Sequence, residues 1–314
     1  MTVCTCPTPH AATRRIAAHA VDRIDPTRTT VLRNQFGRAA TRRLRRLMGE
    51  VRKRILEDED LLTAGDPADA PPLGVGPRRN FTFPRSEQRV RSFSRWLRRR
   101  INAGVLEAEV VEGELIPLGD EPWPNEFVRS SYGKGVQNAR QEVRRSAPQV
   151  AERLGLDTSQ DAIRAALTRP IHADRLGLMF SRTFEEMHGV TDAMAQQMRR
   201  ALVDGMAEGQ GARQLARNLN GRVRNIGITR SRMIARTEVV RAHLHGTIRE
   251  FEAAGVVGVE VRAEILTAAD PCEMCEALEE RSRRIPFTLD EALELFPVHP
   301  NCRCTVIPAV IEDD

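Results

Sequence analysis

The sequence predicts a mainly α-helical protein that ends in a small α+β unit. Apolar residues recur every three or four positions through most of the chain, which is typical of amphipathic helices. After residue 255 the pattern changes to two short runs that favour β-strands. Four of the six cysteines lie in this last part, close to a histidine, in a spacing typical of metal sites. We therefore expect extended basic helices at the N-terminus and a metal-stapled segment at the C-terminus.

Charge is unevenly distributed along the 314 residues. Residues 1–100 hold 22 Lys/Arg and 10 Asp/Glu, a formal charge of +12; residues 101–250 carry +2 and residues 251–314 carry −9. Polyanions should attract the first part and be repelled by the last. No apolar run approaches the roughly 18 residues that a membrane helix needs, and no signal-peptide pattern opens the chain. We expect a soluble protein made in a cytosol, with no membrane partner evident.

The N-terminal region, residues 1–63, is expected to be basic and helical. Apolar residues at three- and four-residue spacing predict one long helix over 31–62, and arginines crowd its other faces. Residues 64–84 hold five prolines and three glycines, which predicts a linker. A second basic helix is expected at about 85–101.

The middle of the chain, residues 85–228, is expected to form a helical domain. The stretch VLEAEVVEGELIPLG predicts a short β-hairpin over 105–119. The helices expected from residue 125 onward are 125–146, 159–168, 172–204, 211–219 and 228–254. The methionines of the third of these helices recur at helical spacing, which is typical of a buried core face.

The last part, residues 229–314, is expected to be the α+β unit that holds the metal site. Residues 256–265 and 304–311 read as strands, and 288–296 as a short helix whose capping box is formed by Thr288 and Glu291. The segment after residue 255 has few aromatic residues. We expect it to need a metal ion to offset the ordering entropy of about 1 to 2 kcal/mol per residue.

Two pairs of candidate metal ligands lie in this unit, each with two residues between its members. Cys272 and Cys275 form the first pair, and His299 and Cys302 form the second. A tight turn directs two side chains to one ion, and two such turns complete the tetrahedral shell that zinc prefers. A tetrahedral shell needs only one of Cys302 and Cys304 beside the other three ligands, so Cys304 is the alternative fourth ligand. We therefore expect a structural zinc ion held by four of these five residues.

Other states of these cysteines stay open. A disulfide fits an oxidising compartment rather than a cytosol, and reduced, metal-free cysteines could pack as small apolar residues. Pro271 through Cys275 matches the Pro-Cys-x-x-Cys half of the nucleobase deaminase signature. The His-x-Glu half is missing, because His245 stands two positions after His243. Four protein ligands also leave no position for a reactive water, which disfavours a catalytic zinc.

Three segments near the C-terminus follow one another in an order that resembles a known family. They are MIARTEVVRAHLHGTIREFEAAGV at 233–256, LTAADPCEMCEALEE at 266–280 and HPNCRC at 299–304. Together they resemble the phage head-morphogenesis family, the minor head proteins typified by the F protein of phage Mu. With the helices that precede them, the resemblance extends from about residue 125 to the end of the chain.

The resemblance implies a virion component without enzymatic activity. It implies a protein made in the host cytoplasm, associated with the phage portal protein and with capsid or scaffold proteins, and then enclosed in the interior of the virion head. It also implies a part in head assembly and in DNA packaging or delivery. The rival hypothesis is a zinc-dependent enzyme that acts on nucleic acid, or a toxin-type transferase.

The arginine-rich helices on both sides of the linker suit contact with the backbone of double-stranded DNA, because each neutralised phosphate releases counterions. Solvated helix faces or an acidic protein partner are the alternatives. The candidate DNA contacts are Arg42, Arg43, Arg45, Arg46, Arg52, Arg98, Arg99 and Arg100.

Arg236, Thr237 and Glu238 have a second interpretation, since arginine and glutamate motifs occur in ADP-ribosyltransferases. Here the three residues are consecutive in a predicted helix, so their side chains face different directions. We expect Arg236 or Glu238 to anchor this helix against the metal-bearing segment by a charge-assisted hydrogen bond.

Overall fold

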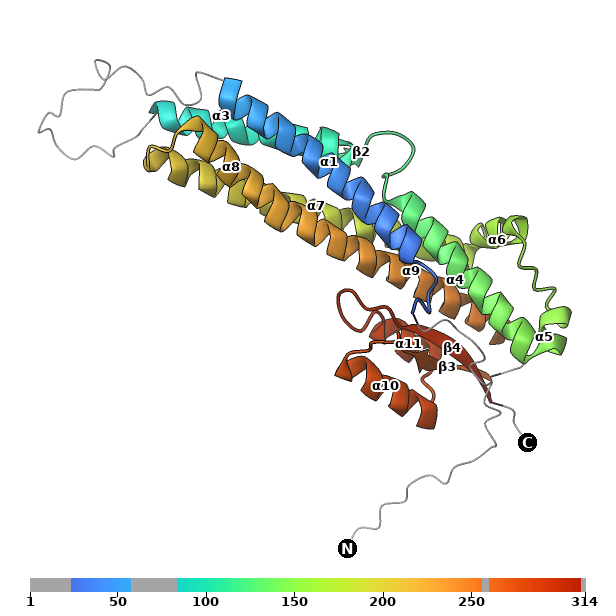
Figure 1. Cartoon of the computed structure of the whole chain (residues 1–314). Coiled ribbons are helices and arrows are strands. Elements are labelled where there is room, and N and C mark those ends of the chain that lie inside the picture. Colours follow the sequence, from blue (N-terminus) through green and yellow to red (C-terminus); the bar gives the residue numbers. More distant parts are fainter. Residues whose placement is uncertain (1–23, 58–83, 256–259, 312–314) are drawn as a thin grey trace, which may run out of the picture. The chain divides into compact units, whose positions relative to one another are not determined.

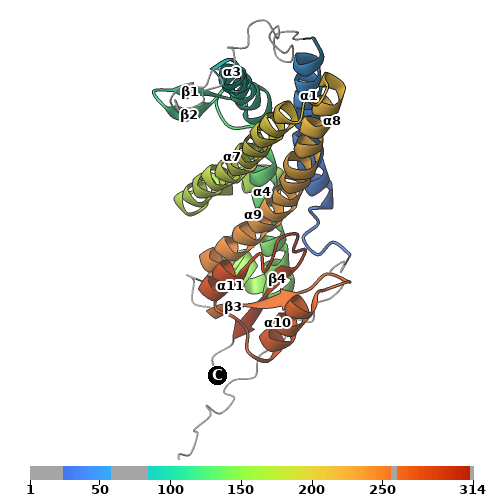
Figure 2. The same cartoon turned by 90° about the vertical axis from the view of Figure 1, so that its left-hand side faces the viewer.

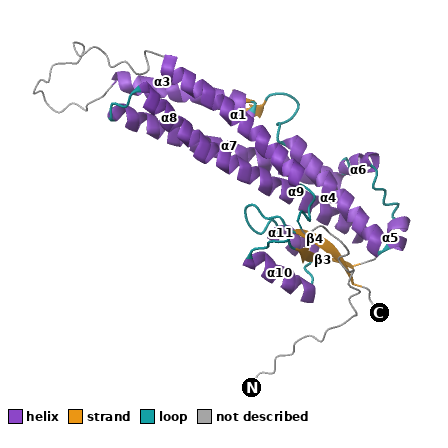
Figure 3. Ribbon diagram, viewed as in Figure 1, coloured by secondary structure: helices purple, strands orange, loops and turns teal. Residues whose placement is uncertain are grey.

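The computed structural model describes residues 24–57, 84–255 and 260–311, and helices make up most of them (Figure 3). The linker expected at 64–84 lies outside the described residues except for Pro84, where a helix begins. None of the described helices has the length and apolar character that a bilayer span requires. The expected mainly helical fold is confirmed.

The chain groups into two compact units, each made of segments that are distant in sequence. Unit 1 takes Met1–Gln35, Asn125–Ser181 and Ala235–Asp314, and unit 2 takes Phe36–Pro124 and Arg182–Ile234. This grouping follows spatial contacts, so three long helices contribute to both units. The chain-order domains expected from the sequence are a different kind of division and stay a prediction.

Unit 2 is built from helices and one hairpin (Figures 1 and 2). Its elements are most of α1 (Thr30–Glu57), α3 (Pro84–Ile101), the π-helical turn η2 (Asn102–Leu106), β1 (Ala108–Val111), β2 (Glu114–Pro117), the second part of α7 (Pro170–Ala207), α8 (Ala212–Arg222), the π-helical turn η3 (Val223–Ile228) and the start of α9 (Thr229–Gly255). The hairpin expected over 105–119 is confirmed, with Ala108 paired to Pro117 and Val111 to Glu114.

The core of unit 2 includes the apolar faces of both basic helices. Leu44 of α1 and Phe93 of α3 are fully buried in one cluster with Met194 of α7 and Leu215 of α8. Burial of a large apolar side chain contributes about 1.5 to 3 kcal/mol, so these faces hold the unit together. The two basic helices are thus parts of a packed helical unit, and the methionines of α7 are core residues as expected.

The helices α8 and α9 are joined without a loop, which the sequence did not indicate. We expected a break between 219 and 228, because glycines punctuate this stretch. Instead η3 continues the helix. A Cβ atom at Gly227 would lie 2.7 Å from the sulfur of Met194 and 3.1 Å from Leu44, so this glycine permits close packing rather than a turn. A true helix end follows Ala207, where Gly209 adopts a φ of +68°.

Unit 1 combines helices with a two-stranded sheet. Its elements are α4 (Asn125–Ser146), α5 (Pro148–Arg153), α6 (Gln160–Leu167), the first part of α7, most of α9, β3 (Glu260–Leu266), α10 (Glu273–Arg284), α11 (Leu289–Leu295) and β4 (Thr305–Ile311). The sheet is antiparallel, with Glu260 opposite Ile311 and Leu266 opposite Thr305. The short helices α5 and α10 were not expected from the sequence. The capping box of α11 is confirmed, with reciprocal hydrogen bonds between Thr288 and Glu291.

The sheet and its short helices share a core with α4 and α9. Phe251 of α9, Phe287, Phe296 and Val306 of β4 belong to one buried cluster, which also includes Ala139 of α4. The acidic C-terminal segment therefore does not rely on its own side chains alone. The helix α9 supplies an apolar partner face, and the expectation that the segment also needs a metal ion stays a prediction.

The helices α4 and α9 approach each other closely at two glycines. A Cβ atom at Gly135 would lie 2.0 Å from the carbonyl oxygen of His243, and one at Gly246 would lie 2.2 Å from that of Tyr132. The hydroxyl of Ser131 donates to the carbonyl of Val239 over 2.6 Å. This close crossing holds α9 in place, and the metal-bearing segment packs against α9.

Gly135→Ala is expected to destabilise the protein by about 3 kcal/mol or more, because the new methyl group overlaps backbone that cannot move cheaply. Gly133→Ala is the matched control two positions away on α4. Its Cβ atom would lie 3.5 Å from Ile163 and 3.6 Å from Leu167, which are ordinary contacts. In a helix this change should be neutral or stabilise by up to about 1 kcal/mol. Chemical denaturation of the two variants measures the difference; similar losses would contradict a steric cause at Gly135.

Candidate metal centre

The first pair of candidate ligands lies at the start of a helix. Cys272 is the N-cap residue of α10 and Cys275 is its third residue, so both sulfur atoms lie at the same helix end. The backbone N–H of Cys275 interacts with the sulfur of Cys272 and lowers the pKa of that thiol. Helix N-termini favour negative charge, which thiolate ligands carry. The sequence did not indicate α10, although this helix explains why the Cys-x-x-Cys spacing brings the two sulfur atoms together.

The second pair lies in a tight turn between α11 and β4. The backbone N–H of Cys302 donates to the carbonyl of His299 over 3.1 Å, which closes the turn. Asn301 has a φ of +64°, a conformation that asparagine tolerates better than most residues. Its N–H donates to the hydroxyl of Thr237 on α9 over 3.2 Å. The turn thus directs His299 and Cys302 to one side and is tied to the long helix.

The two pairs meet. The Nε2 atom of His299 lies 3.3 Å from the sulfur of Cys272 and 3.4 Å from that of Cys275. The ligand atoms of Cys272, Cys275 and His299 lie within 4.8 Å of one another, and so do those of Cys275, Cys302 and Cys304. Cys275 belongs to both groups, which makes it the centre of the cluster.

These separations fit a tetrahedral zinc ion. With Zn–S bonds of about 2.3 Å and Zn–N bonds of about 2.0 to 2.1 Å, two ligating sulfur atoms are about 3.8 Å apart and a sulfur and a nitrogen about 3.5 Å apart. The measured S···N separations of 3.3 and 3.4 Å agree with this geometry. Thiolate and imidazole are also the ligand types that structural zinc sites use.

The ring of His299 is oriented for metal binding. Its Nδ1 atom lies 2.9 Å from the carbonyl oxygen of Pro300, which has no proton to give, so Nδ1–H is the donor. This hydrogen bond raises the pKa of His299 and holds the tautomer in which Nε2 faces the cysteines. Backbone support of this kind is typical of metal-ligating histidines.

The four thiols have very different acidities. The thiol of Cys304 and the backbone N–H groups of Cys304 and Val298 act on Cys302, and together they lower its pKa to about 5 despite burial. Burial, followed by the negative charge on Cys302, raises the pKa of Cys275 to about 12. The pKa of Cys304 is also raised, first by its hydrogen bond to Cys302. Cys302 is therefore the thiol that ionises first in the metal-free site.

The sulfur atoms of Cys302 and Cys304 lie on the same side of the cluster, within 4.8 Å of that of Cys275. Residues two positions apart in an extended segment share a face, which agrees with this placement. Both cysteines are buried and both approach Cys275. The structure thus places the five candidate ligands in two groups of three that share Cys275. The hydrogen bond from the thiol of Cys304 lowers the pKa of Cys302.

The helix that carries Arg236, Thr237 and Glu238 does contact the metal-bearing segment. The hydroxyl of Thr237 accepts a hydrogen bond from the backbone N–H of Asn301. The Nη1 atom of Arg241 lies 3.5 Å from the carbonyl oxygen of Phe296. Glu238 is buried and forms an ion pair with Arg241 at 3.5 Å. Thr237 and Arg241 thus link this helix to the metal-bearing segment, and anchoring by Arg236 or Glu238 stays a prediction.

The candidate DNA contacts are mostly exposed. Arg42, Arg45, Arg46 and Arg52 of α1 and Arg98 and Arg99 of α3 have exposed side chains. Arg43 instead forms an ion pair with Glu107 at 2.8 Å and lies over the ring of Trp123 at 4.0 Å. Arg100 lies 3.6 Å from Glu50. Arg43 therefore has a structural contact that competes with any bound phosphate.

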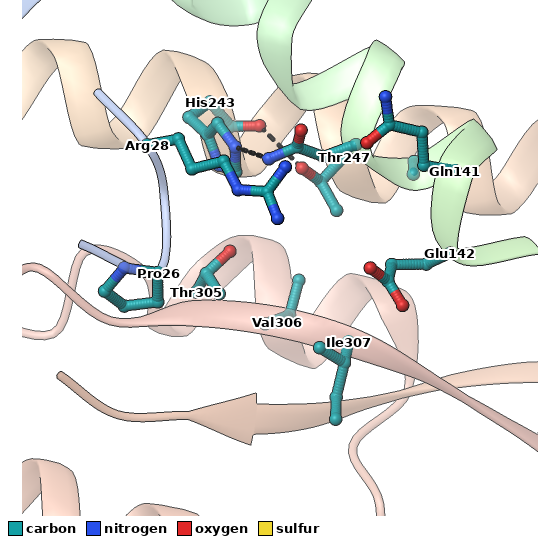
Figure 4. Close-up of a pocket in the computed structure, with 11 residues that line it drawn as sticks. Pro26, Arg28, Gln141, Glu142, His243, Thr247, Thr305, Val306 and Ile307 are labelled. Atoms are coloured by element: carbon teal, nitrogen blue, oxygen red, sulfur yellow. Dashed lines mark hydrogen bonds between the residues drawn. The ribbon is translucent and has the colours of Figure 1, made fainter. Parts of the chain in front are cut away.

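A small cavity lies above strand β4, where α4 and α9 face the sheet (Figure 4). Its volume is about 20 Å³, enough for one water molecule. His243 lines it together with Arg28 and Glu142. Burial lowers the pKa of His243 to about 3, so this ring is neutral, and its Nε2 atom lies 3.0 Å from the side-chain nitrogen of Asn138. The cavity is too small for an organic substrate.

A chain of buried polar side chains links α4, α7 and α9. The hydroxyl of Tyr132 lies 3.0 Å from Nδ1 of His172, whose Nε2 atom lies 3.2 Å from a carboxylate oxygen of Glu250. The other carboxylate oxygen accepts from Nε of Arg140 over 2.7 Å. Arg140 also donates to the carbonyl of Asp157 over 2.7 Å. The sequence did not indicate this network, because its members come from three helices.

Residues 196–307 match the family model described as Phage Mu protein F like protein. The matched range contains all five candidate metal ligands, together with α8, η3 and α9. No curated protein and no solved structure matches the chain significantly.

Proposed function

We propose that this chain is a minor head protein associated with the portal, because its residues 196–307 match the model of the Phage Mu protein F like family, a family of phage head proteins. In this proposal it is made in the host cytoplasm, contacts the portal protein and capsid or scaffold proteins, and is then enclosed in the head interior. There it acts in head assembly and in DNA packaging or delivery. The family match is the observation that carries this proposal.

The metal centre has a structural part in the proposed function. The ligands are Cys272, Cys275, His299 and Cys302, and zinc is the ion that suits them best. Cys304 supports Cys302 by a hydrogen bond, as outer groups around zinc ligands commonly do. With four protein ligands the ion has no open position for a water molecule, so the site staples the chain rather than catalysing a reaction.

Double-stranded DNA is a further proposed partner. The exposed arginines of α1 and α3 lie within or next to residues 1–100, which carry a formal charge of +12. Each phosphate that such arginines neutralise contributes salt-dependent affinity for DNA. DNA contact inside the head is consistent with a part in packaging or delivery.

Co-purification from infected cells tests the proposed function. A tagged chain is expected to be recovered with portal protein and procapsids in low copy number, and to remain inside heads after external protease treatment. An unrelated tagged protein of similar charge is the control for adventitious capture. Absence of the chain from procapsids and from mature heads would contradict the proposal.

A further inference from the structure

A groove of about 520 Å³ in unit 2 is lined by arginines from two helical segments that are distant in sequence. Arg52 of α1 forms one wall, and Arg213, Arg217 and Arg224 of α8 and η3 form the other. The remaining lining residues are Met48, Leu56, Ala216, Asn220 and Gly221. None of these described lining residues is a carboxylate, so four guanidinium groups share the groove with neutral neighbours.

The neighbouring stretch of the chain makes this positive charge more pronounced. Between Gly209 and Thr237 there are seven arginines and no aspartate or glutamate. The average charge over residues 101–250 is close to neutral and hides this run. By contrast, the grooves of about 990 and 840 Å³ in the same unit include Asp192 in one case and Glu185 and Glu186 in the other.

The four arginines are available to a ligand. All have exposed side chains, and among the described residues Arg217 donates to Gln214, a neutral side chain. Arginine binds phosphate through a planar fork of N–H donors and is less strongly hydrated than lysine. The chemistry of the groove therefore fits a chain of phosphate groups.

The spacing and lining favour a duplex backbone over a single strand. Arg213 and Arg217 are four residues apart on α8, about 6 Å along the helix axis, which matches roughly two phosphates of one strand at 3.4 Å of axial rise each. Among the residues that the structure describes, no aromatic side chain lines the groove, whereas single-strand sites stack bases on aromatic rings. Exposed Arg38, Arg42 and Arg45 lie along α1 before Arg52, which extends the positive surface away from the groove.

We propose that this groove binds the phosphate backbone of double-stranded DNA, with Arg52, Arg213, Arg217 and Arg224 as phosphate ligands. The inference deepens the proposed function, since it assigns DNA contact to a specific site made by α1, α8 and η3. It also moves the centre of DNA contact from the N-terminal helices alone to a surface that includes part of the family-matched range.

Binding of short duplex DNA of mixed sequence, measured at several salt concentrations, tests this site. The groove variant replaces Arg52, Arg213, Arg217 and Arg224 by glutamine. The control variant replaces four exposed arginines of unit 1 by glutamine and so removes the same net charge; they are Arg144, Arg145, Arg164 and Arg169. Circular dichroism checks that both variants keep their helix content.

The slope of log affinity against log salt is expected to fall by about 3 to 4 in the groove variant, because about 0.9 of slope is lost per phosphate contact. The control should lose less than about 1. Equal losses in both variants would overturn the proposal, since net charge alone would then explain them. An unchanged slope in the groove variant would also overturn it. If that variant instead failed to co-purify with procapsids, the groove would bind an acidic protein.

The outcome separates this inference from the proposed function. If the wild-type chain binds DNA and the groove variant binds it with an unchanged salt dependence, the groove assignment alone is contradicted. A wild-type chain that does not bind DNA contradicts the groove and the DNA partner together. Recovery of the chain in procapsids tests the head protein itself and does not depend on either result.

Discussion

Cys302→Ser is expected to abolish zinc binding, whereas Cys304→Ser is expected to retain about one zinc per chain. Cys302 has the lowest thiol pKa of the cluster and accepts hydrogen bonds from backbone N–H groups, as a zinc-bound thiolate does. Cys304 has a raised pKa and donates to Cys302, so its proton need not leave when the metal binds. The two substitutions are chemically identical and lie two residues apart, which makes each the control for the other.

Loss of the metal should loosen the segment that it closes. Bound zinc in small sites contributes on the order of 10 kcal/mol in gross terms. The sheet shares a core with α4 and α9, so part of the fold should survive. We expect Cys302→Ser to raise hydrogen exchange in residues 267–304 and to leave α4 and α9 protected. Elemental analysis gives the zinc content. Wild-type protein without zinc, or exchange unaffected by a chelator, would contradict the metal centre.

Glu250→Ala is expected to destabilise the protein by about 3 to 5 kcal/mol, because it leaves Arg140 charged and unpaired in the interior. Arg140 and Glu250 are both almost fully buried and lie 2.7 Å apart. Asp161→Ala is the matched control, since the ion pair of Asp161 with Arg164 is exposed and should contribute less than about 1 kcal/mol. Denaturant unfolding compares the two; equal, small losses would mean that water reaches Arg140.

The same network makes the free energy of unfolding depend on pH in the acidic range. Burial alone would raise the pKa of Glu250, but hydrogen bonds from His172 and Arg140 outweigh it and lower the pKa below its usual range. A carboxyl whose pKa is lower in the folded state stabilises the fold above its ordinary pKa of about 4.3 and loses this contribution as pH falls further. The wild type should therefore lose stability more steeply below about pH 4 than Glu250→Gln. Parallel pH profiles would argue against an ionised Glu250.

The sequence was a good guide wherever local pattern decides structure. The three- and four-residue spacing of apolar side chains was enough to place α1, α3, α4, α7 and most of α9, because one helix face must be buried. Thr288 and Glu291 marked the start of α11 for a similarly local reason. The helix α10 was missed because it is short and polar, and its stability depends on contacts with the sheet.

The candidate ligands could also be named from the sequence, since a tight turn between two cysteines, or between a histidine and a cysteine, is a local feature. Which of them meet is a tertiary question. Cys275 is near Cys272 and His299 on one side and near Cys302 and Cys304 on the other, although 27 residues separate Cys275 from Cys302. Only the folded chain decides that.

The sequence by itself determined the helices, the capping box and the two ligand pairs, since each depends on residues within a few positions of one another. The tertiary structure decided what distant segments build together. It placed Arg52 in one groove with three arginines of α8 and η3. It also connected Tyr132 to Arg140 by polar contacts through His172 of α7 and Glu250 of α9. It also gave the acidic C-terminal sheet a partner in Phe251. Such contacts depend on how helices cross, and the crossing of α4 and α9 depends on the absence of side chains at Gly135 and Gly246, which no periodicity reveals.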